Sequence, residues 1–253
     1  MRSTLFTIFG LQIRSYGLMM AVGFALGIWR AIRVSKKRYG IEPERIYDLA
    51  LVLLVSGVLG ARAVYIFLNP ATENWRDFIA VWQGGLSFHG GLALAMIAGY
   101  VYTRIAKLPY WKCGDLVAPS LAIGYAFTRI GCFLNGCCYG CPTSLPWGVK
   151  FTDEKNSLST APSHPTQIYA FLANLLIFWL LTRLERMNRK PGFVFVSYLG
   201  LYSIYRFLVE FLRSGYSAEM WEFGLTQAQG VSILVIVVSA ALIATLYRKP
   251  AEP

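Results

Sequence analysis

The stretch TRIGCFLNGCCYGCPT, residues 128–143, combines Arg129 with four of the five cysteines of the chain, Cys132, Cys137, Cys138 and Cys141. Zinc sites favour paired Cys-x₂₋₄-Cys motifs separated by a longer segment, and Cys138 and Cys141 offer one such pair. The same pair is also the basis for a redox centre. A structural disulfide in an oxidising compartment is a further interpretation, as are free thiols that pack like small apolar side chains.

Under the last two interpretations, Arg129, Asn135 and the glycines are the functional residues of this stretch. The cysteines then shape and support the site that these residues form. A planar guanidinium at the end of a helix can bind two phosphate oxygens at once. We therefore expect Arg129 to contact an anionic lipid, and we expect no metal and no cofactor.

Other ionisable residues occur in segments that are otherwise apolar: Arg62 in GARAVY, His89 in LSFHGG, and Arg206 with Glu210 in YRFLVEF. An ionisable group at membrane depth costs a few kcal/mol, so each is a hypothesis for a functional site. Structural interpretations remain open. Arg206 and Glu210 are four residues apart and can neutralise each other, Arg62 can extend to the membrane interface, and a lone histidine is often a core residue.

The composition indicates a membrane protein. Of the 253 residues, 56% are hydrophobic and 15% are charged, and the mean hydropathy is +0.48; a soluble domain usually has about 25% charged residues. The net charge of +11 shows that the few charges are mostly basic. In a membrane protein such an excess is expected in the cytoplasmic loops.

Apolar segments of roughly 20 residues, enough to cross a bilayer, predict seven transmembrane helices at 16–34, 46–68, 86–106, 115–137, 167–184, 192–212 and 228–247. Fifteen of the 24 basic residues fall in alternate connections, so the positive-inside rule places the N-terminus outside and the C-terminus in the cytoplasm. The prediction is an all-α bundle that forms one polytopic membrane domain over residues 1–253.

This orientation brings the polar groups toward one side of the membrane. The outer ends of predicted helices contain Tyr16, Gln167 and Tyr169. Arg129 lies near the outer end of a helix that runs outward. His89 begins a helix on the same side. Scattered structural ion pairs would have no reason to gather there, so we predict a site open to the outer leaflet.

Six motifs follow one another along the chain: SYGLMMAVGF, GARAVY, WQGGLSFHGG, TRIGCFLNGCCYG, HPTQIY and YRFLVEFLR. Together they resemble those of the bacterial prolipoprotein diacylglyceryl transferase family over nearly the whole chain, and WQGGLSFHGG is the most specific of them. The resemblance implies a multi-pass transferase of the bacterial inner membrane. Its partners would be phosphatidylglycerol, the lipobox signal peptides of preprolipoproteins and membrane lipid, with no nucleic acid.

The implied reaction moves the diacylglyceryl group of phosphatidylglycerol to the lipobox cysteine and releases glycerol phosphate. Because the nucleophile is the thiol of the substrate, the enzyme needs a base and cations for the leaving phosphate. The resemblance assigns His89 as the base, with Tyr16 as alternative or partner, Arg129 and Arg206 as phosphate contacts, and Glu210 as the residue that orients Arg206. The expected substrate contacts also include Arg62, Gly90, Asn135, Gly140, Gln167 and Tyr169.

The sequence departs from the family pattern at three positions. Cys132 replaces a usual asparagine, Cys137 replaces a frequent carboxylate, and Ala170 replaces a common glutamate. A diverged transferase that acts on another thiol therefore stays open. So do a carrier or flippase for anionic phospholipid, and a membrane thiol oxidoreductase.

Overall fold

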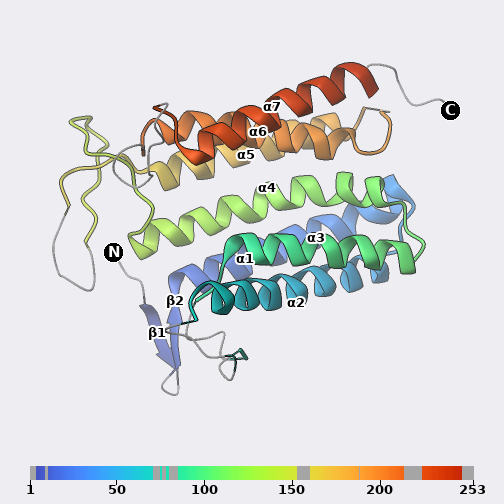
Figure 1. Ribbon diagram of the computed structural model, residues 1–253, viewed down its shortest axis with the longest axis horizontal. Helices are drawn as coiled ribbons and strands as arrows, with labels where there is room; N and C mark the ends of the chain where they lie inside the picture. The colour runs from blue at the N-terminus through green and yellow to red at the C-terminus, as the bar shows by residue number, and fades with distance from the viewer. Residues whose placement is uncertain are drawn as a thin grey trace. The chain divides into compact units, whose positions relative to one another are not determined.

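The computed structural model describes residues 4–8, 11–70, 75, 78–79, 85–152, 160–187, 189–213 and 224–246. Its regular elements are seven α-helices, one π-helical turn and one hairpin (Figure 1). The helices are α1 (Ser15–Val34), α2 (Pro43–Leu68), α3 (Phe88–Ile105), α4 (Tyr110–Asn135), α5 (Thr166–Leu184), α6 (Phe193–Glu210) and α7 (Gln227–Leu246). The π-helical turn η1 (Ser35–Tyr39) extends α1.

Each predicted span corresponds to one of these helices, and most predicted ends lie within three residues of the observed ones. Six helices of the described part are long and apolar enough to cross a membrane. The exception is α3, whose 18 residues include His89, three glycines and Arg104. A seventh crossing and the orientation of the termini stay predictions, and the basic tail with Arg248 and Lys249 lies outside the described residues.

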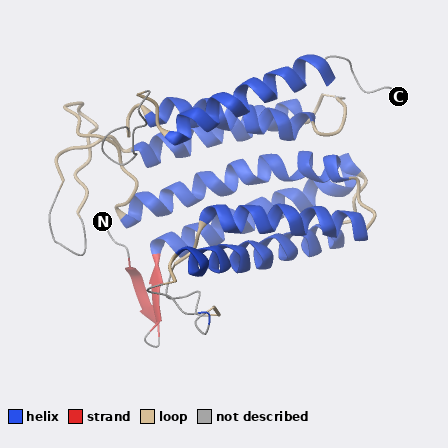
Figure 2. Ribbon diagram, in the orientation of Figure 1, coloured by secondary structure: helices blue, strands red, loops and turns tan. Residues whose placement is uncertain are grey.

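The all-α prediction is wrong for the first residues of the chain. Strands β1 (Thr4–Ile8) and β2 (Leu11–Arg14) form an antiparallel hairpin before α1 (Figure 2). Their register pairs Thr7 with Gln12 and Ile8 with Leu11. Both segments are too short for a stable helix, and four of the five residues of β1 (TLFTI) are β-branched or aromatic.

The chain divides into two compact units, which we describe separately. Unit 1 consists of Met1–Arg30 and Gly114–Pro253, and unit 2 of Ala31–Cys113. The single membrane domain over residues 1–253 stays a prediction.

In unit 2, glycines allow α2 and α3 to pack closely. A Cβ atom on Gly60 would lie 2.5 Å from the carbonyl oxygen of Gly90, so neither position accepts a larger residue without a shift. Small residues let helix backbones approach in this way in membrane proteins. The contact fixes the start of α3, where His89 lies.

In unit 1, glycines similarly bring α1 against α4. A Cβ atom on Gly23 would lie 2.6 Å from the carbonyl oxygen of Gly124.

The start of α6 is capped by Asp115, which lies at the opposite end of α4 from Arg129. The Asp115 carboxylate accepts hydrogen bonds from the backbone N–H groups of Gly192 (2.7 Å) and Phe195 (2.8 Å). This cap satisfies donors that a helix N-terminus leaves open. The buried apolar side chains of this core are Ala118, Ala122, Ile177, Leu181, Phe193, Val194 and Val196.

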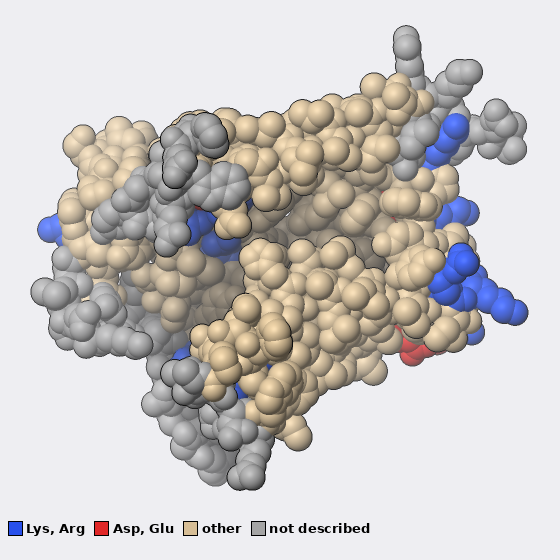
Figure 3. Space-filling view, viewed as in Figure 1, with Lys and Arg blue, Asp and Glu red and all other residues tan. Residues whose placement is uncertain are grey.

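Large apolar side chains are exposed along the helices, among them Leu51, Ile97, Leu176 and Leu234. Uncharged residues cover most of the face shown in Figure 3. Apolar exposure on this scale is unusual for a soluble monomer and is what a helical protein in lipid presents.

Candidate functional site

The guanidinium of Arg129 is held by aromatic residues near the end of α4. It donates a hydrogen bond to the Tyr125 hydroxyl one turn earlier, and its carbon lies 4.6 Å from the centre of the Tyr125 ring. The Tyr202 hydroxyl of α6 in turn donates to Tyr125 at 3.3 Å. The Nε atom of Arg129 is buried and has no hydrogen-bond partner among the described residues. An arginine held on one side with an unsatisfied donor is suited to bind an anion.

Tyr16, the second residue of α1, lies beside this end of α4. A Cβ atom on Gly131 would lie 3.0 Å from Cα of Tyr16, so the glycine permits the contact. Arg129 and three cysteines, Cys132, Cys137 and Cys138, act electrostatically on the Tyr16 hydroxyl. The tyrosine side chain is 39% exposed, so it can still reach a substrate.

At the end of α6, Arg206 forms an ion pair with Glu210 one turn later. The Thr226 hydroxyl donates to the other oxygen of the Glu210 carboxylate at 3.0 Å. Thr226 is the N-cap of α7 in a reciprocal capping box: its N–H donates to Gln229 Oε1 (3.0 Å), and the Gln229 N–H donates to Thr226 Oγ1 (3.3 Å). The start of α7 thereby fixes the carboxylate that orients Arg206.

The loop after α4 is held by the first residues of α5. Thr166 Oγ1 donates to the Cys138 carbonyl at 2.8 Å, and Gln167 Nε2 donates to the Cys137 carbonyl at 2.7 Å. A Cβ atom on Gly140 would lie 2.5 Å from the Leu212 carbonyl oxygen, so a glycine is required there. Gln167 and Gly140 thus shape the loop, and their predicted contact with substrate stays a prediction.

Two further predicted residues lie at this end of unit 1. Asn135 is the last residue of α4 and is exposed. The Tyr169 hydroxyl accepts a hydrogen bond from Trp147 Nε1 at 2.8 Å and lies 3.3 Å from His164 Nδ1. Both residues are therefore near the loop that follows Arg129 in sequence.

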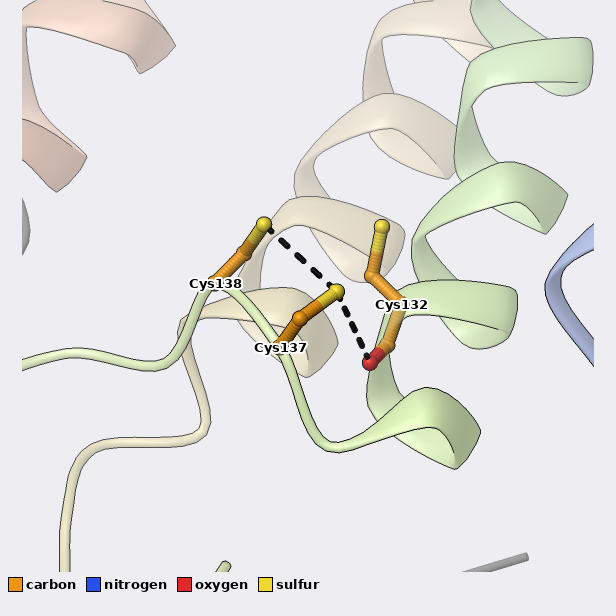
Figure 4. A group of neighbouring side chains, drawn as sticks. All are labelled: Cys132, Cys137 and Cys138. Carbon is orange, nitrogen blue, oxygen red and sulfur yellow. Dashed lines mark hydrogen bonds between the residues drawn. The ribbon is translucent and has the colours of Figure 1, made fainter. Parts of the chain in front are cut away.

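The cysteines are grouped differently from the sequence-based pairing. All five are free thiols, and the sulfur atoms of Cys132, Cys137 and Cys138 lie within 4.8 Å of one another. Figure 4 shows the three side chains arranged around a common space between the end of α4 and the next loop. Cys141 does not belong to this cluster.

Cys138 has a distinct environment within the cluster. Hydrogen bonding with Cys132 and Cys137, followed by the positive charges of Arg129 and Arg213, lowers the pKa of its thiol. Its backbone φ of 66° lies in the left-handed region, which is uncommon for a residue other than glycine. Such a conformation persists only where the surroundings impose it, here through the hydrogen bonds from α5.

In unit 2, His89 and Arg62 have contrasting environments. His89 is exposed at the start of α3, and its ring centre lies 5.8 Å from that of Phe88. Arg62 is 1% exposed, and its NH1 donates to the Gly85 carbonyl at 3.3 Å. Arg62 thus supports the segment before α3, and the alternative of a side chain extended to the interface is wrong. Of the motif WQGGLSFHGG, residues 82–84 lie outside the described part.

Within unit 1 the fold brings together Tyr16, Arg129 and the cysteine cluster, and separately links Arg206 with Glu210. The sequence analysis missed Tyr125 and Thr226. The four-residue spacing of Tyr125 and Arg129, and the Thr-x-x-Gln pattern before an apolar helix, are signals that would have found them. The two units are described separately, so the grouping of His89 with the unit 1 residues stays a prediction.

Comparison with known proteins identifies the family of the chain. The family model described as prolipoprotein diacylglyceryl transferase matches residues 3–245. The chain belongs to this family.

Relatives named phosphatidylglycerol–prolipoprotein diacylglyceryl transferase extend over nearly the same length. The protein of Clostridium tetani (strain Massachusetts / E88) is 35% identical over 241 residues, which cover 94% of this chain and 95% of the relative. That of Geobacillus kaustophilus (strain HTA426) is 36% identical over 234 residues, with 90% and 86% covered. The predicted membership of the prolipoprotein diacylglyceryl transferase family is confirmed.

Proposed function

We propose that this chain transfers the diacylglyceryl group of phosphatidylglycerol to the lipobox cysteine of preprolipoproteins, from the outer leaflet of the bacterial inner membrane. The match to the family over residues 3–245 is the observation that carries the proposal. Arg129 and Arg206 of unit 1 are positioned by their neighbours and can bind a phosphate group. The apolar helices suit a lipid substrate.

In this reaction the sulfur of the substrate cysteine attacks the glyceryl carbon that bears the phosphate ester. A carbon–sulfur bond forms, the carbon–oxygen bond to phosphate breaks, and glycerol phosphate leaves with the bonding electrons. The thiol proton passes to a base on the enzyme, because the thiolate is the reactive form. No oxidant or reductant is required.

Cations are needed where the leaving phosphate gains negative charge. Arg206 suits this role because Glu210, which is itself held by Thr226, binds one side of its guanidinium, while the arginine side chain remains 24% exposed. Arg129 suits it because Tyr125 holds the guanidinium and leaves the buried Nε unpaired within the described part. Both positions favour a planar fork over a point charge.

An apolar groove between α5 and α6 offers room for an acyl chain. It has a volume of about 380 Å³, and the residues that line it include Tyr169, Leu176, Leu180, Val209 and Leu212. Its lining also includes Tyr205, so the sequence neighbours of Arg206 and Glu210, Tyr205 and Val209, both face the groove. A phospholipid bound there would place its tail in the groove and its phosphate toward Arg206.

Two residues are candidates for the base. His89 is exposed and free to turn toward a substrate, and Tyr16 lies within the electrostatic reach of Arg129. We assign the base to His89 and a supporting role to Tyr16, because histidine is the side chain that most often acts as a general base in enzymes.

The test uses the full-length protein in vesicles of phosphatidylglycerol with a synthetic lipobox peptide. We expect the peptide to gain the mass of a diacylglyceryl group, and vesicles of phosphatidylethanolamine to give no product. Arg129→Ala should abolish most of the gain. Arg183→Ala is the matched control, since Arg183 also stacks on an aromatic ring one turn earlier, at 5.2 Å from Trp179, but far from the loop after α4.

Phospholipid movement between leaflets with an unmodified peptide would instead identify a carrier. A diverged transferase would leave the lipobox peptide unchanged and move no lipid between leaflets, but would modify another thiol compound. Either result would contradict the proposal.

A further inference from the structure

The cysteine cluster, Cys132, Cys137 and Cys138, has the dimensions of a metal site with three thiolates. Zinc–sulfur bonds of about 2.3 Å place tetrahedrally arranged sulfurs about 3.8 Å apart. The Sγ atoms of Cys137 and Cys138 are 3.7 Å apart, and all three sulfurs lie within 4.8 Å of one another (Figure 4). A movement of less than about 1 Å would bring all three to bonding distance of one ion.

The sequence analysis expected no metal because zinc sites favour two separated Cys-x₂₋₄-Cys pairs, and it considered one such pair in this stretch, Cys138 with Cys141. Folding instead places Cys132, from the last turn of α4, against the two adjacent cysteines of the loop. Because α4 continues to Asn135 and Gly136 then takes a positive φ of 73°, the chain reverses and returns toward Cys132. The Cys137 N–H donates to the Cys132 carbonyl at 3.2 Å, which closes this turn.

The cluster is also held from outside. Thr166 and Gln167 bind the carbonyl groups of Cys138 and Cys137, and Cys138 is kept at a φ of 66°. Metal sites depend on such supporting hydrogen bonds, whose loss typically weakens affinity by about 10–100-fold. The thiols are therefore positioned before any ion binds.

The charges nearby suit a complex with several thiolates. A divalent ion with three thiolates carries a net negative charge. Arg129 and Arg213 are positively charged and both act electrostatically on Cys138, so they would stabilise such a complex. Thiolates select soft or borderline ions over magnesium and calcium, which prefer oxygen ligands.

We propose that Cys132, Cys137 and Cys138 form a binding site for one thiophilic divalent cation of the zinc class, with the fourth coordination position left to water or another ligand. On binding, each thiol releases its proton and contributes one metal–sulfur bond. The proposal is argued from the positions of the three sulfur atoms and not from the proposed transfer, so it does not depend on that function.

The first test titrates the reduced full-length protein in detergent, without oxygen, with Co²⁺ as a spectroscopic probe. We expect thiolate-to-cobalt charge-transfer absorption that saturates at about one ion per chain and is displaced by Zn²⁺. Cys132→Ser and Cys138→Ser should each weaken binding by at least about 100-fold. Cys141→Ser is the matched control and should bind as the unaltered protein does.

A second test needs no substitution and so does not depend on the folding of variants. The protein is alkylated with N-ethylmaleimide with and without Zn²⁺, and the cysteines are read by peptide mass. We expect Zn²⁺ to protect Cys132, Cys137 and Cys138 and to leave Cys141 reactive. Equal protection of Cys141, no saturable binding of Co²⁺, or a disulfide between two of the three in protein isolated from its membrane would overturn the proposal.

Discussion

Arg206 and Glu210 form an ion pair on one face of α6 in which the two side chains differ sharply in exposure. The arginine side chain is 24% exposed and the glutamate side chain 2%. The carboxylate therefore depends on protein partners, Arg206 and Thr226, whereas the guanidinium can also contact a substrate. This difference separates a positioning role from a binding role.

We first predict the effect of Glu210→Gln. It leaves Arg206 without its carboxylate partner in a poorly solvated place, and breaking such a pair from one side typically costs about 3–5 kcal/mol. We expect the free energy of unfolding to fall by about 3 kcal/mol, because Arg206 is partly exposed, and diacylglyceryl transfer to fall by about 100-fold. Denaturant unfolding and peptide mass measure the two effects.

The double variant Arg206→Gln with Glu210→Gln separates the two roles. Recovered stability without transfer would agree with a substrate role for Arg206. Recovered transfer would reduce the pair to a structural ion pair.

The second prediction concerns Thr226→Val. The substitution removes the hydroxyl that both binds Glu210 and caps α7, and loss of a cap costs about 0.5–2 kcal/mol. We expect a lower midpoint of thermal unfolding and about 10-fold slower transfer with little change in the apparent affinity for phosphatidylglycerol. Thr182→Val removes a comparable hydroxyl, bonded to the Trp179 carbonyl, and should leave transfer unchanged. If both variants behaved alike, the link from Thr226 to Glu210 would have no catalytic effect.

The third prediction compares Arg129→Lys with Arg129→Ala. A lysine keeps the charge but loses the fork that meets Tyr125 and two phosphate oxygens at once. We expect kcat/KM to fall by about 100-fold or more in both variants, while the pair Arg183→Lys and Arg183→Ala stays within about 2-fold of the unaltered protein. Full activity of Arg129→Lys would show that a point charge is sufficient.

The fourth prediction distinguishes the candidate bases. If His89 takes the thiol proton, His89→Ala should lower transfer by about 100-fold or more. Tyr16→Phe should reduce the rate by only about 10-fold. Tyr100→Phe, at an exposed tyrosine of α3, is the control. A larger loss of transfer in Tyr16→Phe than in His89→Ala would reverse the assignment.

The fifth prediction tests the loop after α4 through Gly140→Ala. The added Cβ atom would meet the Leu212 carbonyl oxygen at 2.5 Å and Thr166 Cγ2 at 2.8 Å, and overpacking typically costs about 1–3 kcal/mol. We expect lower stability and slower transfer. Gly57→Ala is matched, since its Cβ atom would find no neighbour closer than 3.9 Å, and it should be neutral or slightly stabilising. Equal tolerance of both would mean that the loop adjusts freely.

The sequence predicted the helices well because the bilayer sets their length and composition. Even the fourth helix, which contains Pro119, Arg129 and several glycines, is continuous from Tyr110 to Asn135. The pairing of β1 with β2 was not predicted, since short segments with a mixed pattern carry little periodicity. The motifs around Arg129, His89 and Arg206 likewise indicated the family from the order of residue types alone.

The partners of these residues depended on the tertiary structure. Composition and spacing determined that Arg206 and Glu210 share a face of one helix, because that follows from the helical repeat. They did not reveal that Thr226, from another helix, binds the same carboxylate. Nor did they reveal that Cys132 joins Cys137 and Cys138 in place of Cys141. Contacts between separate helices depend on how glycines set their distance and on how a turn reverses the chain, and neither is a local property of the sequence.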